Sequence, residues 1–501
     1  MLDPNSRIAR PGLCLVILLF ASFVFGADSN PKITPLVRVV DLSIGETLTV
    51  KLSDGSSAIV ELKSLEEKRD SLRDAIREAR VEVVVNGKAV SLVSANYQLP
   101  KTVGGVRIDC SITCGYVGNS GRDSWGLKKD ARLRLWPAGS PLMRPGTFGY
   151  PLRQRWFASG TQMANEPTFV DGGERPKNKK IYYHNDLDFG GAEGMIDVLA
   201  ATDGLVVSFA GETLPKFAQS PARKRYDVIY LLDDRGWFYR YSHLHSMDSK
   251  IELGQRVRRG QRLGFLGKEG GSGGWAHLHF GIVMKQPSGE WGTHEAYALA
   301  WEAYLNDHQP KILAVARPHR LARVGENVTL DGSKSWSGSG KIESFKWTFT
   351  DGAGATGKSI ERSYSKPGMY SEILEVKDAA GQIAYDFAVV QVIGDEGDEN
   401  LPPSIQAAYA PTFGIRAGDP VTFKTRTFRT THGSEVWDFG DGSPKVTVKS
   451  DGNAKKLAID GFAVIEHAYA RPGHYLARVE RSNEMGHTAV AHLHVEVGPA
   501  R

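Results

Sequence analysis

The stretch Trp437-Asp-Phe-Gly-Asp-Gly442 recurs in looser form 90 residues earlier, as Trp347-Thr-Phe-Thr-Asp-Gly352. A second block, Tyr-x-x-Pro-Gly-x-Tyr, follows each copy, at Tyr364–Tyr370 and at Tyr469–Tyr475. Apolar and polar residues alternate around these blocks, and Asp-Gly and Pro-Gly pairs mark tight turns between the alternating runs. This internal repeat predicts two small antiparallel β-sandwiches at the C-terminal end of the chain.

The two copies, residues 309–394 and 402–497, resemble polycystic kidney disease (PKD) domains, whose hallmark W-D-F-G-D-G is complete in the second copy. The resemblance implies Ig-like sandwiches that act in extracellular proteins as spacers or as binding modules for protein or carbohydrate. We expect Trp347 and Trp437 in the two cores, because tryptophan is highly buried on average. The second copy also carries an insertion between its Trp and its first Tyr. The acidic segment 395–403 is predicted to be a proline-stiffened linker.

Residues 151–307 hold three motifs that contain five of the 14 histidines: His184-Asn-Asp-Leu-Asp188, Tyr241-Ser-His243-Leu-His245 and His277-Leu-His279-Phe-Gly281. A hydrolytic zinc site needs three protein ligands and one open position. The chain has only three cysteines, so such a site would rest on histidine and carboxylate. Residues two apart in a strand share a face, so the pair in the third motif can face one cleft.

The order and the flanks of these motifs resemble the lysostaphin/LytM-type zinc metallopeptidases, which cut peptide cross-links of bacterial peptidoglycan. The family pattern is H-x-x-x-D, then Y-x-H-L, then H-L-H-F, and the match covers residues 178–285. The resemblance implies an antiparallel β catalytic domain with zinc held by His184, Asp188 and His279, while His243 and His277 orient the attacking water and stabilise the tetrahedral intermediate.

Several positions depart from this pattern or stand apart from it. Asp186 replaces the usual glycine between the two ligands of the first motif and adds a competing carboxylate, while His245 is a third candidate imidazole. Leu214–Arg225 is predicted to be an inserted loop at the rim of the groove. The glycine-rich run Gly270–Gly274 is predicted to form a flexible groove wall. His492-Leu-His494 has no companion motif, so we interpret it as structural.

The N-terminus predicts export. Two arginines precede the apolar run Leu13–Phe25, and small residues follow it, which is typical of a secretory signal peptide over residues 1–26. The run is shorter than the roughly 20 residues that span a bilayer. An uncleaved anchor is the alternative. No later stretch is long and apolar enough to span, so we expect a secreted, periplasmic or cell-surface protein. A formal net charge of +5 on 501 residues does not argue for nucleic-acid binding.

Residues 28–150 are predicted to be a β-rich module without a catalytic constellation. Asp54-Gly55 and Asn86-Gly87 each separate two apolar alternating runs, which predicts two hairpins. Between them, Ser64-x-x-Glu67 predicts the start of a short helix that runs to Arg80. Packing, recognition and occlusion of a neighbouring site all remain open as roles. A second helix, over Ala296–Leu305, is expected to close the following domain.

Cys110 and Cys114 are the only thiols of the mature chain, and an oxidising compartment would allow them to pair. Four residues of straight strand would hold their Cα atoms about 13 Å apart, which is too far for a disulfide. A bridge therefore requires a turn at residues 111–113.

Together these patterns predict a mainly β, four-domain protein: an exported zinc metalloendopeptidase acting on peptidoglycan cross-bridges or stem peptides, or on another extracellular peptide. The sandwiches would then serve as spacers or as binding modules for carbohydrate or protein. One alternative is a non-catalytic wall-binding or regulatory protein that keeps the peptidase fold. Another is an extracellular adhesion protein.

Overall fold

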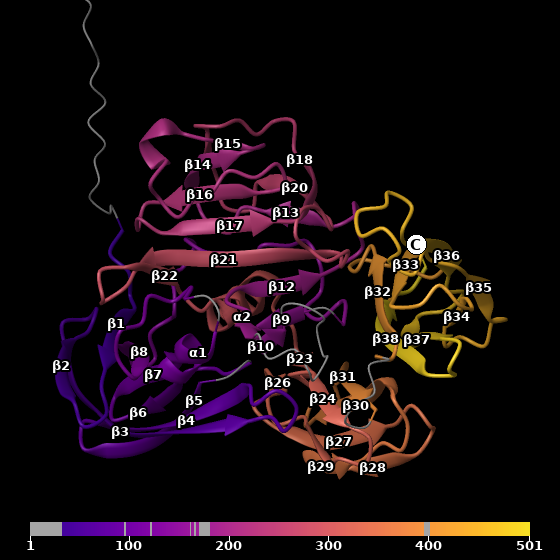
Figure 1. Ribbon diagram of the computed structural model, residues 1–501, viewed down its shortest axis with the longest axis horizontal. Coiled ribbons are helices and arrows are strands. Elements are labelled where there is room, and N and C mark those ends of the chain that lie inside the picture. The colour runs from indigo at the N-terminus through magenta and orange to yellow at the C-terminus, as the bar shows by residue number, and fades with distance from the viewer. Residues whose placement is uncertain are drawn as a thin grey trace, which may run out of the picture.

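The computed structural model describes residues 33–94, 97–120, 123–160, 162–164, 167–169, 181–394 and 401–500. Figure 1 shows four β-rich lobes grouped around the long strand β21 (His277–Lys285), so the mainly β prediction is confirmed. The predicted signal peptide and residues 395–400 of the predicted linker lie outside the described residues. Within the described ranges, neither helix has the length and apolar character needed to cross a bilayer.

Two four-stranded antiparallel sheets form the N-terminal module, with strand orders β2-β3-β4-β5 and β1-β8-β7-β6. The elements are β1 (Arg38–Leu42), β2 (Thr47–Lys51), β3 (Ser57–Arg69), β4 (Ile76–Val85), β5 (Lys88–Ser94), β6 (Lys101–Val103), β7 (Val106–Thr113), α1 (Cys114–Asn119) and β8 (Ala131–Pro137). The hairpins predicted at Asp54-Gly55 and Asn86-Gly87 are confirmed.

The helix predicted from Ser64 to Arg80 is wrong. Ser64 and its neighbours continue β3, which pairs with β4 in a register that places Leu65 opposite Val81 and Glu67 opposite Ala79. From Ala79 onward β4 buries every second residue, most of them valine, on one face. That period-two burial against the neighbouring strands outweighs a local helix-start pattern, because packing routinely overrides propensity.

The possible disulfide between Cys110 and Cys114 does not form in this structure, and both cysteines are free. Cys110 is buried in β7, and that strand continues to Thr113 before Cys114 opens α1. The turn that a bridge would require at residues 111–113 is therefore absent.

A nine-stranded sheet dominates the next lobe, in the order β15-β14-β16-β17-β21-β12-β9, with β19 beside β14 and β22 beside β21. Its elements and those of the adjoining small sheets β10-β11 and β13-β20-β18 are β9 (Gln162–Ala164), β10 (Pro167–Phe169), β11 (Ile181–Tyr183), β12 (Leu187–Gly190), β13 (Asp197–Leu199), β14 (Gly204–Phe209), β15 (Glu212–Thr213), η1 (Pro215–Phe217), β16 (Ile229–Asp233), β17 (Phe238–Ser242), β18 (Leu244–Met247), β19 (Arg256–Val257), β20 (Arg262–Leu266) and β22 (Trp291–Thr293). The expected closing helix is present as α2 (Tyr297–His308).

Two sandwiches complete the chain and share one sheet, because β30 of the first pairs in parallel with β38 of the second. Their strands are β23 (Ile312–Leu313), β24 (Arg320–Arg323), β25 (Val328–Asp331), β26 (Trp336–Ser337), β27 (Ile342–Thr348), β28 (Gly354–Thr356), β29 (Ser359–Arg362), β30 (Gly368–Asp378), β31 (Ile383–Ile393), β32 (Ser404–Ala410), β33 (Pro420–Phe428), β34 (Glu435–Asp438), β35 (Val446–Val448), β36 (Ala463–Ala468), β37 (Gly473–Ser482) and β38 (Thr488–Val497). Trp347 and Trp437 are 0% exposed in separate cores, as predicted.

Buried contacts tie these lobes together. The largest apolar cluster extends from the nine-stranded sheet to Trp136 of the N-terminal module and to Phe462 of the second sandwich. Arg134, fully buried, binds Asp109 of its own module and Glu295 across the boundary. A charge buried this deeply requires such partners. The lobe built on the nine-stranded sheet is therefore in buried contact with both the N-terminal module and the second sandwich.

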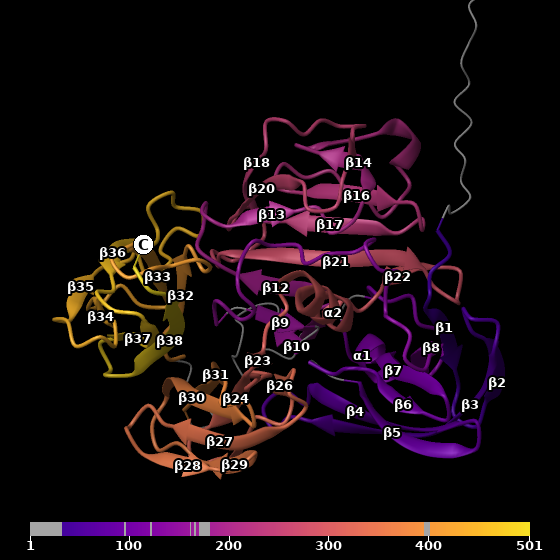
Figure 2. The same ribbon diagram turned by 180° about the vertical axis from the view of Figure 1, so that it is seen from behind.

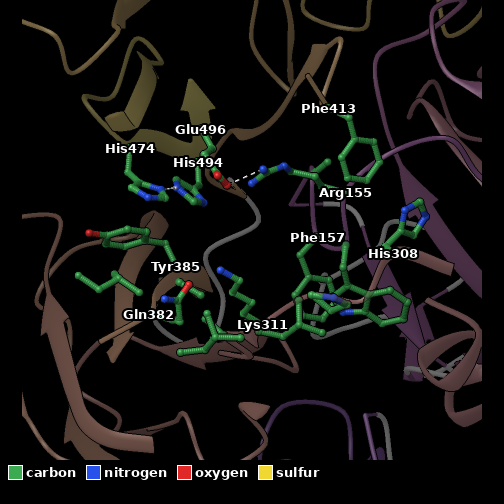
Figure 3. Close-up of a pocket in the computed structure, with 18 of the residues that line it drawn as sticks. Arg155, Phe157, His308, Lys311, Gln382, Tyr385, Phe413, His474, His494 and Glu496 are labelled. Atoms are coloured by element: carbon green, nitrogen blue, oxygen red, sulfur yellow. Dashed lines mark hydrogen bonds and ion pairs between the residues drawn. The ribbon is translucent and has the colours of Figure 1, made fainter. Parts of the chain in front are cut away.

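A cavity of about 540 Å³ lies where the lobe of the nine-stranded sheet meets both sandwiches. Figure 3 shows Arg155 paired with Glu496, and the His474 ring beside that of His494, along one edge of this space. His492 stacks on Phe387 of the first sandwich, and His494 lies 2.9 Å from His474. These packing contacts agree with the structural role predicted for His492-Leu-His494.

Candidate metal and catalytic centre

Three neighbouring strands of the nine-stranded sheet carry the candidate site. In the pairing of β12 with β21, Asp188 lies directly opposite His279 and Gly190 opposite His277. On the other side of β21, Ser242 at the end of β17 pairs with His279. The third motif therefore runs along the central strand, and the other two motifs flank it.

His184, Asp188 and His279 converge on one point. His184 Nε2 lies 3.1 Å from His279 Nδ1 and 3.1 Å from Asp188 Oδ2, while Asp188 Oδ1 lies 2.8 Å from His279 Nδ1. All three residues are buried. Ligand atoms about 2.0–2.1 Å from a tetrahedral zinc ion lie about 3.3 Å from one another, so this set fits such an ion with little movement.

A second group that could hold a metal consists of His243, His277 and His279, and it shares His279 with the first. The first group combines two imidazoles with one carboxylate, which is a common ligand set for a catalytic zinc with an open position. The second offers neutral nitrogen alone. The chemistry of the donors therefore favours the first group as ligands and leaves His243 and His277 beside the ion.

Hydrogen bonds fix the orientation of these two imidazoles. His277 Nδ1 lies 3.0 Å from the carbonyl oxygen of Trp275, and His243 Nδ1 lies 2.6 Å from that of Glu269. A carbonyl only accepts, so each Nδ1 carries the proton and donates it. Nε2 is then the lone-pair nitrogen of both rings, whose centroids lie 4.7 Å apart.

Asp186, predicted as a competing carboxylate, instead lies on the far side of His279. Its Oδ2 is 2.9 Å from His279 Nε2, so the ring donates to Asp186 and turns Nδ1 towards His184 and Asp188. Gly281 makes room for this carboxylate, because a Cβ atom there would lie 2.4 Å from Asp186 Oδ2. Metal-binding histidines commonly hold such an outer carboxylate.

Asp227 is a site residue that the sequence reasoning missed. Its Oδ2 accepts from the backbone N–H of His243 at 3.2 Å and lies 3.4 Å from His243 Nδ1. Arg225 forms an ion pair with the same carboxylate. His243 itself has a φ of +67°, a left-handed conformation that is costly for a non-glycine residue. No spacing motif links Asp227 to the histidines, so only the fold brings them together.

Burial shapes the protonation of the cluster. Burial would raise the pKa of Asp188, but the imidazoles of His184 and His277 outweigh it and hold that pKa well below its usual range. Burial lowers the pKa of His277 to about 3 and also lowers that of His243. Burial would raise the pKa of Asp227, yet hydrogen bonds from His243 and Arg225 bring it down to about 2. The imidazoles of His243 and His277 are therefore neutral near pH 7.

Three other predicted features lie outside the donor sets. The half-exposed ring of His245 faces Glu193, with His245 Nδ1 3.6 Å from the Glu193 carboxylate. Residues 214–225 pack partly against the sheet, where Leu214 and Phe217 join an apolar cluster around Phe238. The run Gly270–Gly274 was predicted to be flexible, but its last residues are hydrogen-bonded to the second sandwich.

Comparison with known protein families identifies three domains. The model of peptidase family M23 matches residues 182–289, and the PKD domain models match residues 308–392 and 405–497. The M23 match contains all three histidine motifs.

Individual relatives overlap only in part. A microbial collagenase of Vibrio alginolyticus is 25% identical over 151 residues, which are 28% of this chain and 19% of that protein. The chain thus spans about a fifth of the length of this relative. Lysostaphin from Staphylococcus simulans is 17% identical, with 41% of this chain and 82% of that one covered at a TM-score of 0.20. A putative M23 peptidase from Pseudomonas aeruginosa is 18% identical, covering 53% and 96% at a TM-score of 0.21.

Proposed function

Because the chain carries an M23 peptidase domain followed by two PKD domains, we propose that it is an exported zinc-dependent endopeptidase. Its substrates are peptide bonds of peptidoglycan, in cross-bridges or stem peptides. The observation that carries this proposal is the convergence of His184, Asp188 and His279 on one point, with the two oriented imidazoles of His243 and His277 beside it.

His184 Nε2, His279 Nδ1 and one Asp188 oxygen hold the ion in this proposal. When bound, zinc acts as a Lewis acid that lowers the pKa of a water molecule towards 7 and polarises the scissile carbonyl. The negative charge of Asp188 offsets part of the charge of the ion, and Asp186 keeps His279 in the tautomer that points its Nδ1 lone pair at the site.

His243 and His277 handle the protons. Their Nδ1 protons are held by the carbonyls of Glu269 and Trp275, so Nε2 of each ring is free to accept a proton from the attacking water. The same nitrogen can return that proton to the leaving amine. Asp227 supports His243 by favouring its cationic form during the transfer.

The proposal also assigns a role to each segment outside the metal site. The apolar run Leu13–Phe25 directs export, and residues 28–150 support the peptidase domain, proposed to span 151–307. The two sandwiches, proposed to span 309–394 and 402–497, hold the enzyme on carbohydrate or protein of the wall. The substrate class rests on the resemblance to wall-cutting peptidases rather than on a pocket of defined shape.

The test compares four full-length proteins: wild type, His279→Ala, His277→Ala and, as a matched control, His245→Ala. Bound zinc is measured by elemental analysis, and hydrolysis is measured by release of new amino groups from purified peptidoglycan. We expect wild type and His245→Ala to hold one zinc and to hydrolyse the substrate. His279→Ala should lose both properties, whereas His277→Ala should keep zinc and lose hydrolysis.

Three outcomes would contradict the proposal. A wild-type protein that binds no zinc would rule out the proposed zinc-dependent mechanism. An undiminished rate of hydrolysis in His279→Ala would rule out the proposed zinc ligands. A zinc-loaded wild type that cuts none of several peptidoglycan types would point instead to a non-catalytic wall-binding protein.

A further inference from the structure

The second sandwich holds the chain segment that leads into His277. Gln406, in β32, forms two hydrogen bonds with a single residue: its Nε2 donates to the carbonyl of Ala276 at 2.7 Å, and its Oε1 accepts from the Ala276 N–H at 2.8 Å. Gln406 is only 2% exposed. Figures 1 and 2 both show β32 and β33 beside the N-terminal end of β21, where His277 begins the strand.

A second buried side chain reinforces this contact. Arg426, in β33, is 0% exposed and donates from Nη1 to the carbonyl of Gly274 at 3.1 Å. Its other nitrogens pair with the carboxylate of Asp451 at 2.6–2.8 Å, so the guanidinium is held in place. One residue further on, the Trp275 ring stacks on Phe428, with centroids 4.0 Å apart and planes inclined by 6°. Three successive residues, 274–276, are therefore fixed by the second sandwich.

The inserted segment of the second sandwich takes part in this attachment. Asp451 and Asn453 lie between Trp437 and Tyr469, in the interval that is longer in the second copy than in the first. Asn453 Nδ2 donates to the carbonyl of Gly273 at 3.1 Å. Gly274 has a φ of +93°, and a Cβ atom there would lie 2.3 Å from Asn453 Oδ1. The glycine thus permits a close approach that a larger residue would prevent.

The attached segment includes the atom that sets the tautomer of His277. The carbonyl of Trp275 accepts the proton of His277 Nδ1, and it lies between the two residues that Arg426 and Gln406 hold. We propose that Gln406 and Arg426 are positioning residues for His277, so that the second PKD sandwich is a working part of the catalytic centre. This inference rests on the proposed function, since it assigns His277 a role in hydrolysis.

The test uses the full chain with Gln406→Leu, which keeps the side-chain volume but removes both hydrogen bonds to Ala276. A misplacement of about 1 Å at a catalytic group can cost about 100-fold in rate. We expect kcat to fall about 10- to 100-fold, KM to change less than about threefold, and zinc content to stay at the wild-type value, because His277 is not a ligand. Thr447→Ala, at an exposed position of strand β35 in the same sandwich, should leave all three values unchanged.

Hydrogen–deuterium exchange of the peptide covering residues 268–277 gives a readout that needs no catalysis. We expect Gln406→Leu to speed exchange in this peptide, because the Ala276 N–H loses its acceptor. Unchanged exchange would overturn the inference, as would faster exchange with an unchanged kcat or a loss of zinc. If the wild type hydrolyses nothing, the proposed function fails, while exchange and the nitrogen chemical shifts of the His277 ring still decide whether Gln406 positions it.

A milder variant covers the case in which Gln406→Leu does not fold. Asn453→Gly suits the positive φ of +59° at this position and removes only the bond to Gly273. It should change exchange and kcat in the same direction by a smaller factor. A wild-type result for both readouts would then overturn the inference.

Discussion

Replacing Asp186 tests whether the extra carboxylate in the first motif supports the metal site or competes with it. Asp186 is 3% exposed, and its Oδ2 lies 2.9 Å from His279 Nε2, whereas the proposed ligand atom of the same ring, Nδ1, faces His184 and Asp188. Loss of an outer carboxylate of this kind typically costs about 10- to 100-fold in metal affinity, or about 1.4–2.7 kcal/mol. We therefore expect Asp186→Ala to weaken zinc binding by that factor.

The assay is competition for zinc between the full-length protein and a chelator of known affinity at one pH. Asp186→Asn keeps an acceptor for the His279 N–H but loses the charge, so its affinity should lie between those of wild type and Asp186→Ala. Asp227→Asn is the matched control, because Asp227 is a buried carboxylate beside an imidazole that is not a proposed ligand. The reasoning is refuted if Asp186→Ala binds zinc within twofold of wild type. Equal losses in Asp186→Ala and Asp227→Asn would refute it too.

Three further predictions concern stability and the thiols. Burial lowers the pKa of His492 to about 3. Below pH 6.5 the unfolded chain therefore binds a proton that the folded chain does not, and the free energy of unfolding decreases as the pH is lowered. Between pH 7 and pH 5 the free energy of unfolding, measured by urea titration, should therefore drop by about 2 kcal/mol less in His492→Phe than in wild type. Equal drops would contradict this. Trp437→Ala should cost about 3–5 kcal/mol in thermal or urea unfolding, against less than about 0.5 kcal/mol for exposed Thr447→Ala, and similar values for both would be inconsistent with the buried position of Trp437. A maleimide should label Cys114 in the folded protein but Cys110 only after unfolding, because burial raises the pKa of Cys110 to about 12; a disulfide-linked peptide in the mass spectrum would rule this out.

Local sequence patterns predicted the secondary structure correctly where the packing of the folded chain favours the same structure. Asn86-Gly87 specifies a tight turn by backbone conformation alone, and the hairpin it predicts is present. The Ser64 helix failed for the opposite reason. Its start pattern is equally compatible with a strand, and only the neighbouring strand β4, whose alternate residues are buried, decides between them.

In the candidate site, too, local spacing predicts some features, whereas others depend on the fold. The H-x-H spacing correctly predicts that His277 and His279 share a face of one strand, because the period of a strand is two residues. The partners that orient these rings come from elsewhere in the fold. Asp227 lies before a different strand, and Gln406 lies 130 residues beyond Ala276 in another domain. No spacing in the sequence encodes such contacts. The hydrogen bonds that Gly273 and Gly274, in the predicted groove wall, accept from the second sandwich are of the same kind.

We propose that one zinc ion is held by two nitrogens and one carboxylate from the first and third motifs. A crystal structure of the zinc-loaded full-length protein, with anomalous data at the zinc edge, measures this directly. We expect one strong anomalous peak bonded to His184 Nε2, His279 Nδ1 and an Asp188 oxygen, with the rings of His243 and His277 beside it and not bonded. A peak bonded to His243 or Asp186, or no peak in this cluster, would contradict it.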